Sequence, residues 1–143
     1  MRAFFDVNML LALVDPEHVF HAKASAWWHA HRVLGWASSP TTQNGALRIA
    51  SGSSYSNPIK LADAIVVVRQ WTEAPGHVFW PDDVSLFDQK VIDHDRLLGR
   101  RQITDAYLLA LAVKNGGRLV TLDQAVPMRA VKGARAEHLA VIL

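Results

Sequence analysis

Cysteine is absent from the 143 residues of the chain. No disulfide can therefore hold the fold, and its stability must come from a hydrophobic core. A chain of this length can bury such a core without a structural metal, so we expect a single domain over residues 1–143.

Long apolar runs are missing as well. No stretch approaches the roughly 20 apolar residues that a membrane span requires. The first residues also lack the long apolar core and the small-residue cleavage site of a signal peptide. Together with the absence of cysteine, this predicts a soluble, cytoplasmic protein that has no membrane partner.

A dense block of basic residues is the third feature that the chain lacks. Its formal net charge is only +2, although its isoelectric point is about 9.2. Net charge bears on association rather than on fold, and this balance mildly favours an anionic partner such as nucleic acid. The composition, with 50% hydrophobic and 20% charged residues, is ordinary for a globular protein.

Short apolar segments alternate along the chain with segments of helical periodicity. We expect strands at residues 2–5, 36–38, 77–80, 118–123 and 138–143. We expect helices at residues 8–14, about 18–33, 43–49 with a capped start at 39–42, 59–71, 87–98 and 105–113. This order predicts an α/β fold, in which helices cover both faces of a central parallel sheet of about five short strands.

Two of the expected strands end in an aspartate, Asp6 and Asp123. If these strands are neighbours, the two aspartates project from strand ends that are roughly 4.8 Å apart. Asp105 is a third candidate, in the first turn of a helix for which we expect Thr104 to be the N-cap. Taken singly, each acid is also typical of a turn or a helix cap, and the other aspartates between residues 82 and 95 are expected to form a solvated face.

Three carboxylates at one place make chemical sense mainly with a divalent cation. Without a cation, Asp6, Asp105 and Asp123 would repel one another and raise one another's pKa. Carboxylate oxygens are the ligands that Mg²⁺ prefers. The three aspartates therefore predict a metal site at the carboxyl edge of the sheet.

The order and spacing of several segments resemble those of the PIN-domain ribonucleases. More narrowly, the chain is similar to the VapC-type toxins of bacterial toxin–antitoxin pairs. The residues that carry the resemblance lie in segments 5–8, 15–18, 40–45, 103–112 and 119–123. The resemblance implies a PIN-like three-layer fold with a central parallel sheet flanked by helices.

The resemblance also implies an activity and a set of partners. It implies a metal-dependent endoribonuclease that hydrolyses RNA phosphodiester bonds with a metal-activated water. Asp6, Asp105 and Asp123 would hold Mg²⁺ or Mn²⁺. The expected partners are an RNA substrate, a small cognate antitoxin protein and a second copy of the chain in a homodimer.

One position departs from the family pattern. Many relatives carry a glutamate early in the third helix, where this chain has Asn44. We count Asn44 with the catalytic set, since its amide can offer a carbonyl oxygen to a metal, but it brings no charge and cannot act as a base. The alternative is therefore a catalytically weak PIN-like module that binds RNA or the antitoxin.

Three further residues have candidate supporting roles. Asn8 and Thr121 are close enough in sequence to the acids to orient a carboxylate or a metal-bound water. Helix capping and strand hydrogen bonding are the alternatives for these two residues. Arg101 precedes the Asp105 helix and could meet a phosphate, or it could simply be solvated.

A phosphatase of the haloacid-dehalogenase type is a more distant alternative. Such enzymes also begin with an apolar strand that ends in an aspartate. They need a second acid two residues later for proton transfer, and that position is Asn8 here.

Overall fold

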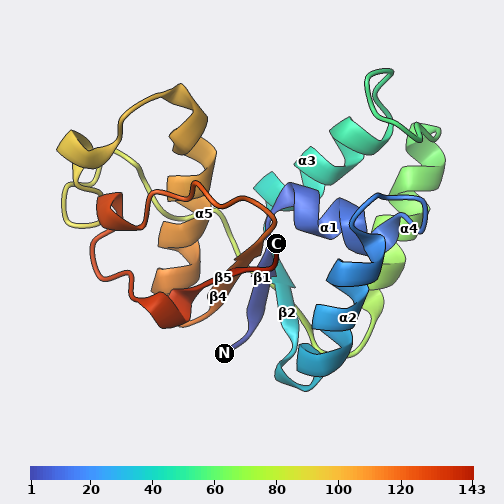
Figure 1. The fold of residues 1–143 in the computed structure, drawn as a ribbon, viewed down its shortest axis with the longest axis horizontal. Coiled ribbons are helices and arrows are strands. Elements are labelled where there is room, and N and C mark those ends of the chain that lie inside the picture. The colour runs from blue at the N-terminus through green and yellow to red at the C-terminus, as the bar shows by residue number, and fades with distance from the viewer.

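The computed structural model describes residues 1–143, which form a five-stranded sheet in the order β3-β2-β1-β4-β5 (Figure 1). All four neighbouring pairs are parallel. The strands are β1 (Ala3–Phe5), β2 (Trp36–Ser38), β3 (His77–Phe79), β4 (Arg118–Thr121) and β5 (Leu139–Val141). The expected α/β fold with a parallel sheet of about five short strands is confirmed.

Strand register brings the first and fourth strands together. Strand β1 lies at the centre of the sheet, where Phe4 pairs with Ala37 of β2 on one side and with Leu119 of β4 on the other. Because all strands run the same way, the residues after Phe5 and Thr121 emerge at one edge. The condition under which Asp6 and Asp123 project from neighbouring strand ends is therefore met.

Helices cover both faces of the sheet. In chain order they are α1 (Val7–Val14), α2 (His21–His31), α3 (Pro40–Ala50), α4 (Leu61–Glu73) and α5 (Ile103–Lys114). Helices α1 to α4 lie on one side of the sheet and α5 lies on the other, which gives three layers (Figure 1). None of these helices is both long enough and apolar enough to cross a membrane.

The alternation of side chains along β1 divides the hydrophobic core. Phe5 packs into the layer of α1 to α4, where its ring stacks on that of Trp36 with the ring centroids 5.5 Å apart. Phe4 points to the opposite face and packs with α5 and Trp80. Both phenylalanines are buried, as expected for a central parallel strand covered on two faces.

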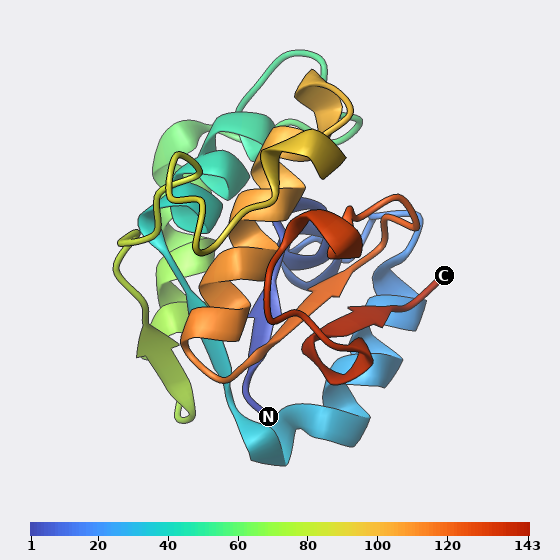
Figure 2. The ribbon, with the colours of Figure 1, turned by 90° about the vertical axis from the view of Figure 1, so that its left-hand side faces the viewer.

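The prediction of a helix at residues 87–98 is wrong. The segment between β3 and α5 contains only two 3₁₀ turns, η2 (His94–Arg96) and η3 (Arg100–Gln102). The Asp88 and Asp93 carboxylates accept hydrogen bonds from the backbone N–H groups two residues further on, a local arrangement that competes with helix formation. Figure 2 shows this segment, in yellow and gold, beside α5.

Long-range backbone contacts hold the irregular segment instead. Ile92 forms an isolated antiparallel bridge with Val131, and the Asp93 N–H donates to the Ala130 carbonyl at 2.8 Å. The 3₁₀ turns η2 and η4 (Met128–Ala130) consequently pack against each other. The chain before α5 is thereby joined to the chain after β4.

Two helix starts differ from expectation. Helix α2 begins at His21 rather than near His18, because the His18 ring accepts the Phe20 N–H in a turn. Thr104 is not an N-cap: α5 begins at Ile103, and the Ile103 N–H already donates to the Arg100 carbonyl of η3. The preceding 3₁₀ turn therefore replaces the expected side-chain cap.

Candidate active site

Asp6 connects the central strand to the first helix. It is the N-cap of α1, where its Oδ1 accepts the Met9 N–H at 2.8 Å. Its own backbone N–H donates to the Val120 carbonyl of β4 at 3.2 Å. Only 6% of the residue is exposed, so a carboxylate is held inside the molecule at the carboxyl edge of the sheet.

Thr121 links Asp6 to Asp123. The buried Thr121 hydroxyl donates to Asp6 Oδ2 and accepts the Asp123 N–H at 2.9 Å. Asp123 Oδ1 in turn accepts the Ala125 N–H at 2.8 Å, which shapes the turn after β4. One hydroxyl therefore fixes the relative position of two of the three predicted acids.

Asp105 approaches the same place from the other layer. It lies in the first turn of α5 and is half-buried. Burial raises the pKa of its carboxyl to about 6, and the nearby carboxylates of Asp123 and Asp6 contribute to the rise. The structure thus brings Asp105 close enough to Asp6 and Asp123 for their charges to disfavour its ionisation.

Burial is also the main cause of the perturbation at Asp6. It raises the pKa of this carboxyl to about 6, although the hydrogen bonds from Thr121 and Met9 favour the ionised form and partly offset the rise. The charge of Asp123 adds to the rise. Two acids with raised pKa values at one edge of a sheet are typical of a functional site.

The donor set fits a hard divalent cation, because it consists of carboxylate oxygens alone and its crowded charges are those that a cation would neutralise. As the side chains lie, however, no three Asp, Glu, His or Cys residues are placed to enclose a metal ion. Asp123 is exposed and has one carboxylate oxygen free of the Ala125 hydrogen bond.

The other predicted residues lie outside this hydrogen-bonded cluster. Asn44 is exposed on α3, whose Gly45 approaches Val7 of α1, and it makes no side-chain hydrogen bond. Asn8 is exposed in the first turn of α1, also without a side-chain hydrogen bond. Arg101 is exposed in η3 and forms no ion pair.

Sequence reasoning missed one polar contact at the same edge. Asp82, expected only as part of a solvated face, accepts hydrogen bonds from the backbone N–H and the hydroxyl of Thr41 at 2.9 and 2.8 Å. It thereby holds the first turn of α3. The nearby Tyr107 hydroxyl is buried without a hydrogen-bond partner, and burial together with the Asp82 charge raises its pKa. The position of Asp82 just after an expected strand was the available signal.

Comparison with solved structures supports the fold. The crystal structure of Mycobacterium tuberculosis VapC20, described as a Sarcin-Ricin loop cleaving toxin, matches with a TM-score of 0.63 over 93% of this chain and 98% of the VapC20 chain. The sequence identity is 14%, so this likeness concerns the fold alone. It confirms the expected PIN-like architecture.

Curated sequences give a closer likeness, whereas no family model matches the chain. Ribonuclease VapC44 of Mycobacterium tuberculosis is 49% identical over 142 residues, which cover 99% of this chain and 100% of that protein. Ribonuclease VapC39 of the same species is 42% identical over 134 residues, or 93% of this chain and 96% of that protein. The chain therefore belongs to the VapC ribonuclease family.

Proposed function

We propose that this protein is an endoribonuclease that hydrolyses RNA phosphodiester bonds and acts as the toxin of a toxin–antitoxin pair. One observation carries the proposal: the Thr121 hydroxyl joins Asp6 to Asp123 at the carboxyl edge of the sheet, near enough to Asp105 for both carboxylates to raise its pKa, in a chain 49% identical to Ribonuclease VapC44. The membership of the VapC family supports the RNA substrate and the cognate antitoxin as partners. We also propose a homodimer, which the oligomeric state in solution tests.

The cofactor that we propose is Mg²⁺ or Mn²⁺, held by Asp6, Asp105 and Asp123. Such an ion supplies Lewis-acid activation of water and neutralisation of charge at the phosphorus when it is bound. The protein contributes the position of the ligands, since Asp6 is fixed by the Met9 N–H and by the Thr121 hydroxyl. Because the charges of Asp123 and Asp6 disfavour ionisation of Asp105, a bound cation would be favoured by neutralising them.

The experiment measures cleavage of a mixed pool of labelled RNA with Mg²⁺ or Mn²⁺. We expect cleavage by the wild type and a loss of at least about 100-fold in rate for Asp6→Asn, because a ligand of the activating ion is weakened. Asp63→Asn, an exposed aspartate on α4, is the matched control and should cleave as the wild type does. Equal cleavage by wild type and Asp6→Asn would reveal a contaminating nuclease.

A second candidate function is an RNA- or antitoxin-binding module with weak catalysis. The observation that favours it is Asn44, an exposed amide without charge at the place where many relatives have a glutamate. If the protein is such a module, the same assay should show little RNA cleavage by the wild type with either metal. The Asn44→Glu variant should then cleave RNA faster than the wild type. Efficient cleavage by the wild type would exclude it.

A further inference from the structure

A cleft with a volume of about 440 Å³ lies between the two irregular segments that precede α5 and follow β4. One wall comes from η2, η3 and the residues between them, and the other comes from the segment after β4 that includes η4. Gln102 in the first wall is three residues before Asp105, and Val126 in the second wall is three residues after Asp123. Each wall of the cleft is therefore close in sequence to one of the candidate metal ligands.

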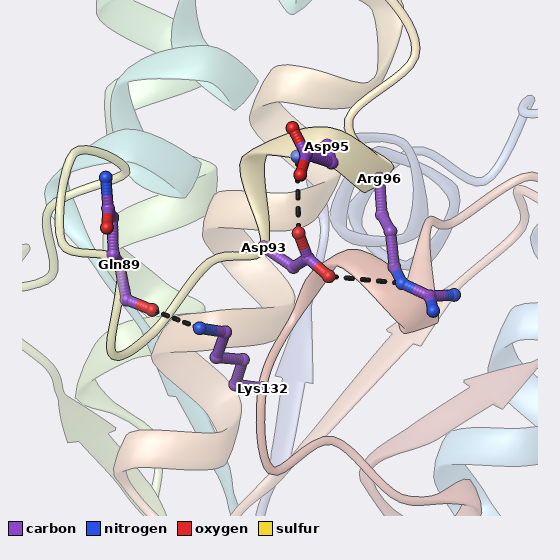
Figure 3. A network of polar contacts seen from close by, with 5 residues as sticks. All are labelled: Gln89, Asp93, Asp95, Arg96 and Lys132. Atoms are coloured by element: carbon purple, nitrogen blue, oxygen red, sulfur yellow. Dashed lines mark hydrogen bonds and ion pairs between the residues drawn. The ribbon is translucent and has the colours of Figure 1, made fainter.

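The contacts around the cleft hold its walls together. Figure 3 shows the Asp93 carboxylate between the Asp95 N–H at 3.2 Å and the Arg96 guanidinium at 3.1 Å. Lys132, which follows the second wall, donates to the carbonyl of Gln89, which precedes the first wall, at 2.6 Å. These bonds add to the bridge between Ile92 and Val131, so the cleft exists before any ligand binds.

The lining combines three kinds of chemistry. Leu98 is 82% exposed, and it faces the cleft with the half-buried Met128, which leaves apolar surface open to solvent. The Gln102 Oε1 accepts the Leu98 N–H at 2.8 Å, so its amide NH₂ remains free to donate. Arg129 is exposed at the rim and takes part in none of the three ion pairs of the structure.

This combination matches a nucleotide. A base presents an apolar face and hydrogen-bonding edges, and its phosphate suits a guanidinium. Among the charged residues of the lining, Arg96 is engaged by Asp93 and Asp95 is an acid, so Arg129 is the cation available to a phosphate. The exposed Arg100 and Arg101 of η3, which also lack ion pairs, add positive charge to the segment that precedes Asp105.

We propose that the cleft binds an unpaired nucleotide of the RNA next to the bond that is cut, with its base against Leu98 and Met128 and its phosphate on Arg129. The inference rests on the proposed function, because it takes the bound RNA to be the substrate and the walls of the cleft lead along the chain to Asp105 and Asp123. A base bound here selects the substrate sequence at one position, since Gln102 can donate to its edge.

Binding without cleavage tests the proposal. Fluorescence anisotropy would follow a labelled 12-nucleotide pool of random single-stranded RNA in EDTA, which prevents metal-dependent cutting. We expect Arg129→Gln to weaken binding about fivefold and to lower the slope of log K against log salt by about 1. The matched control is Arg69→Gln, an exposed arginine of α4 in the opposite layer, which should bind as the wild type does.

A second probe separates the base from the backbone. Leu98→Ala should weaken binding of the RNA pool about threefold, because apolar contact with a base is lost. It should leave unchanged the binding of an abasic ribose-phosphate strand of the same length. Both substituted residues are exposed, and thermal unfolding checks that the variants remain folded.

The outcomes distinguish this inference from the proposed function. Equal binding by wild type, Arg129→Gln and Leu98→Ala would overturn the nucleotide cleft, even if the protein cleaves RNA. Failure of the wild type to bind the pool, or equal weakening of the abasic strand by Leu98→Ala, would overturn it as well. Loss of binding in the variants of a protein that never cleaves RNA would support the cleft and refute the nuclease.

Discussion

At the scale of single residues, Thr121 decides how the acidic site is organised. Its hydroxyl donates to the buried Asp6 carboxylate and accepts the Asp123 N–H. It therefore links, by hydrogen bonds, two acids that are remote in sequence. A hydrogen bond to a buried charge contributes more than one at the surface, and removing it leaves that charge poorly solvated. Thr121 therefore acts on the chemistry through Asp6, as a positioning residue.

Replacement of Thr121 by valine keeps its shape and removes the hydroxyl. We expect Thr121→Val to lower the free energy of unfolding by about 1–3 kcal/mol, because Asp6 loses a buried hydrogen bond. We also expect Mg²⁺ affinity to fall about 10-fold or more. Urea denaturation and metal titration measure the two effects.

The control for this variant is Thr72→Val on α4, whose hydroxyl donates only to the exposed Arg69 carbonyl. It should change stability by about 0.5 kcal/mol or less and leave Mg²⁺ affinity unchanged. A loss of stability in Thr121→Val with unchanged metal affinity would assign Thr121 a purely structural role.

At the scale of elements, helix α3 packs against α1 at a glycine. A Cβ built on Gly45 would lie 2.6 Å from Val7 Cγ2, and Val7 directly follows Asp6. Valine is stiff and has no flexible end that could move away. This contact therefore sets how closely the helix that carries Asn44 approaches the acidic site.

We expect Gly45→Ala to lower the free energy of unfolding by about 1–3 kcal/mol, since overpacking outweighs the gain in helix propensity. Val7→Ala in the same chain should restore most of the loss, because it removes the methyl group that clashes. Gly99→Ala is the control, as no atom lies within 4 Å of its added Cβ. Urea denaturation of the three variants and the wild type measures these effects, and a stabilised Gly45→Ala would contradict the close approach.

Element prediction from sequence succeeded where local pattern and tertiary packing agree. The apolar strands β1 and β4 and the helix α5 lie where periodicity placed them, because their side chains are buried on the faces that the pattern indicated. The segment 87–98 failed, because its conformation depends on a bridge to residues about 40 positions away and on aspartates that bind their own backbone. Local pattern carries no information about such a bridge.

Prediction of the site residues likewise succeeded where a local pattern was sufficient and failed where the position depends on tertiary packing. The strand-end rule was sufficient to propose Asp6 and Asp123 together, because parallel strands end at one edge. The nucleotide cleft was not predictable, since Leu98 and Met128 meet only through the packing of two irregular segments. The place of Asn44 relative to the acids likewise depends on how closely α3 approaches α1.

At the scale of the whole molecule, the acidic site opposes folding at neutral pH. The pKa values of Asp6 and Asp105 in the native state are about 6, above the ordinary value of 3.8 for an aspartate. The native state therefore holds these protons more tightly than the unfolded chain does. The contribution of the two groups to stability is full at low pH and is lost as pH rises from about 4 through about 6.

We expect the metal-free protein to lose stability over this pH interval relative to an Asp6→Asn/Asp105→Asn double variant, in which neither group titrates. Mg²⁺ should stabilise the wild type more at about pH 7.5 than at about pH 5, because it binds the ionised carboxylates. Thermal unfolding with and without Mg²⁺ measures both effects. A wild type that tracks the double variant at every pH would mean that these carboxyls are not perturbed.

The long-range hydrogen bond between Thr121 and Asp6 spans 115 positions of the chain. During synthesis the central strand emerges first, yet its neighbour β4 leaves the ribosome near the end. The hydrogen bond that organises the acidic edge therefore cannot form until residues 118–121 have been synthesised. Asp6 consequently remains without its Thr121 partner while the intervening chain is being made.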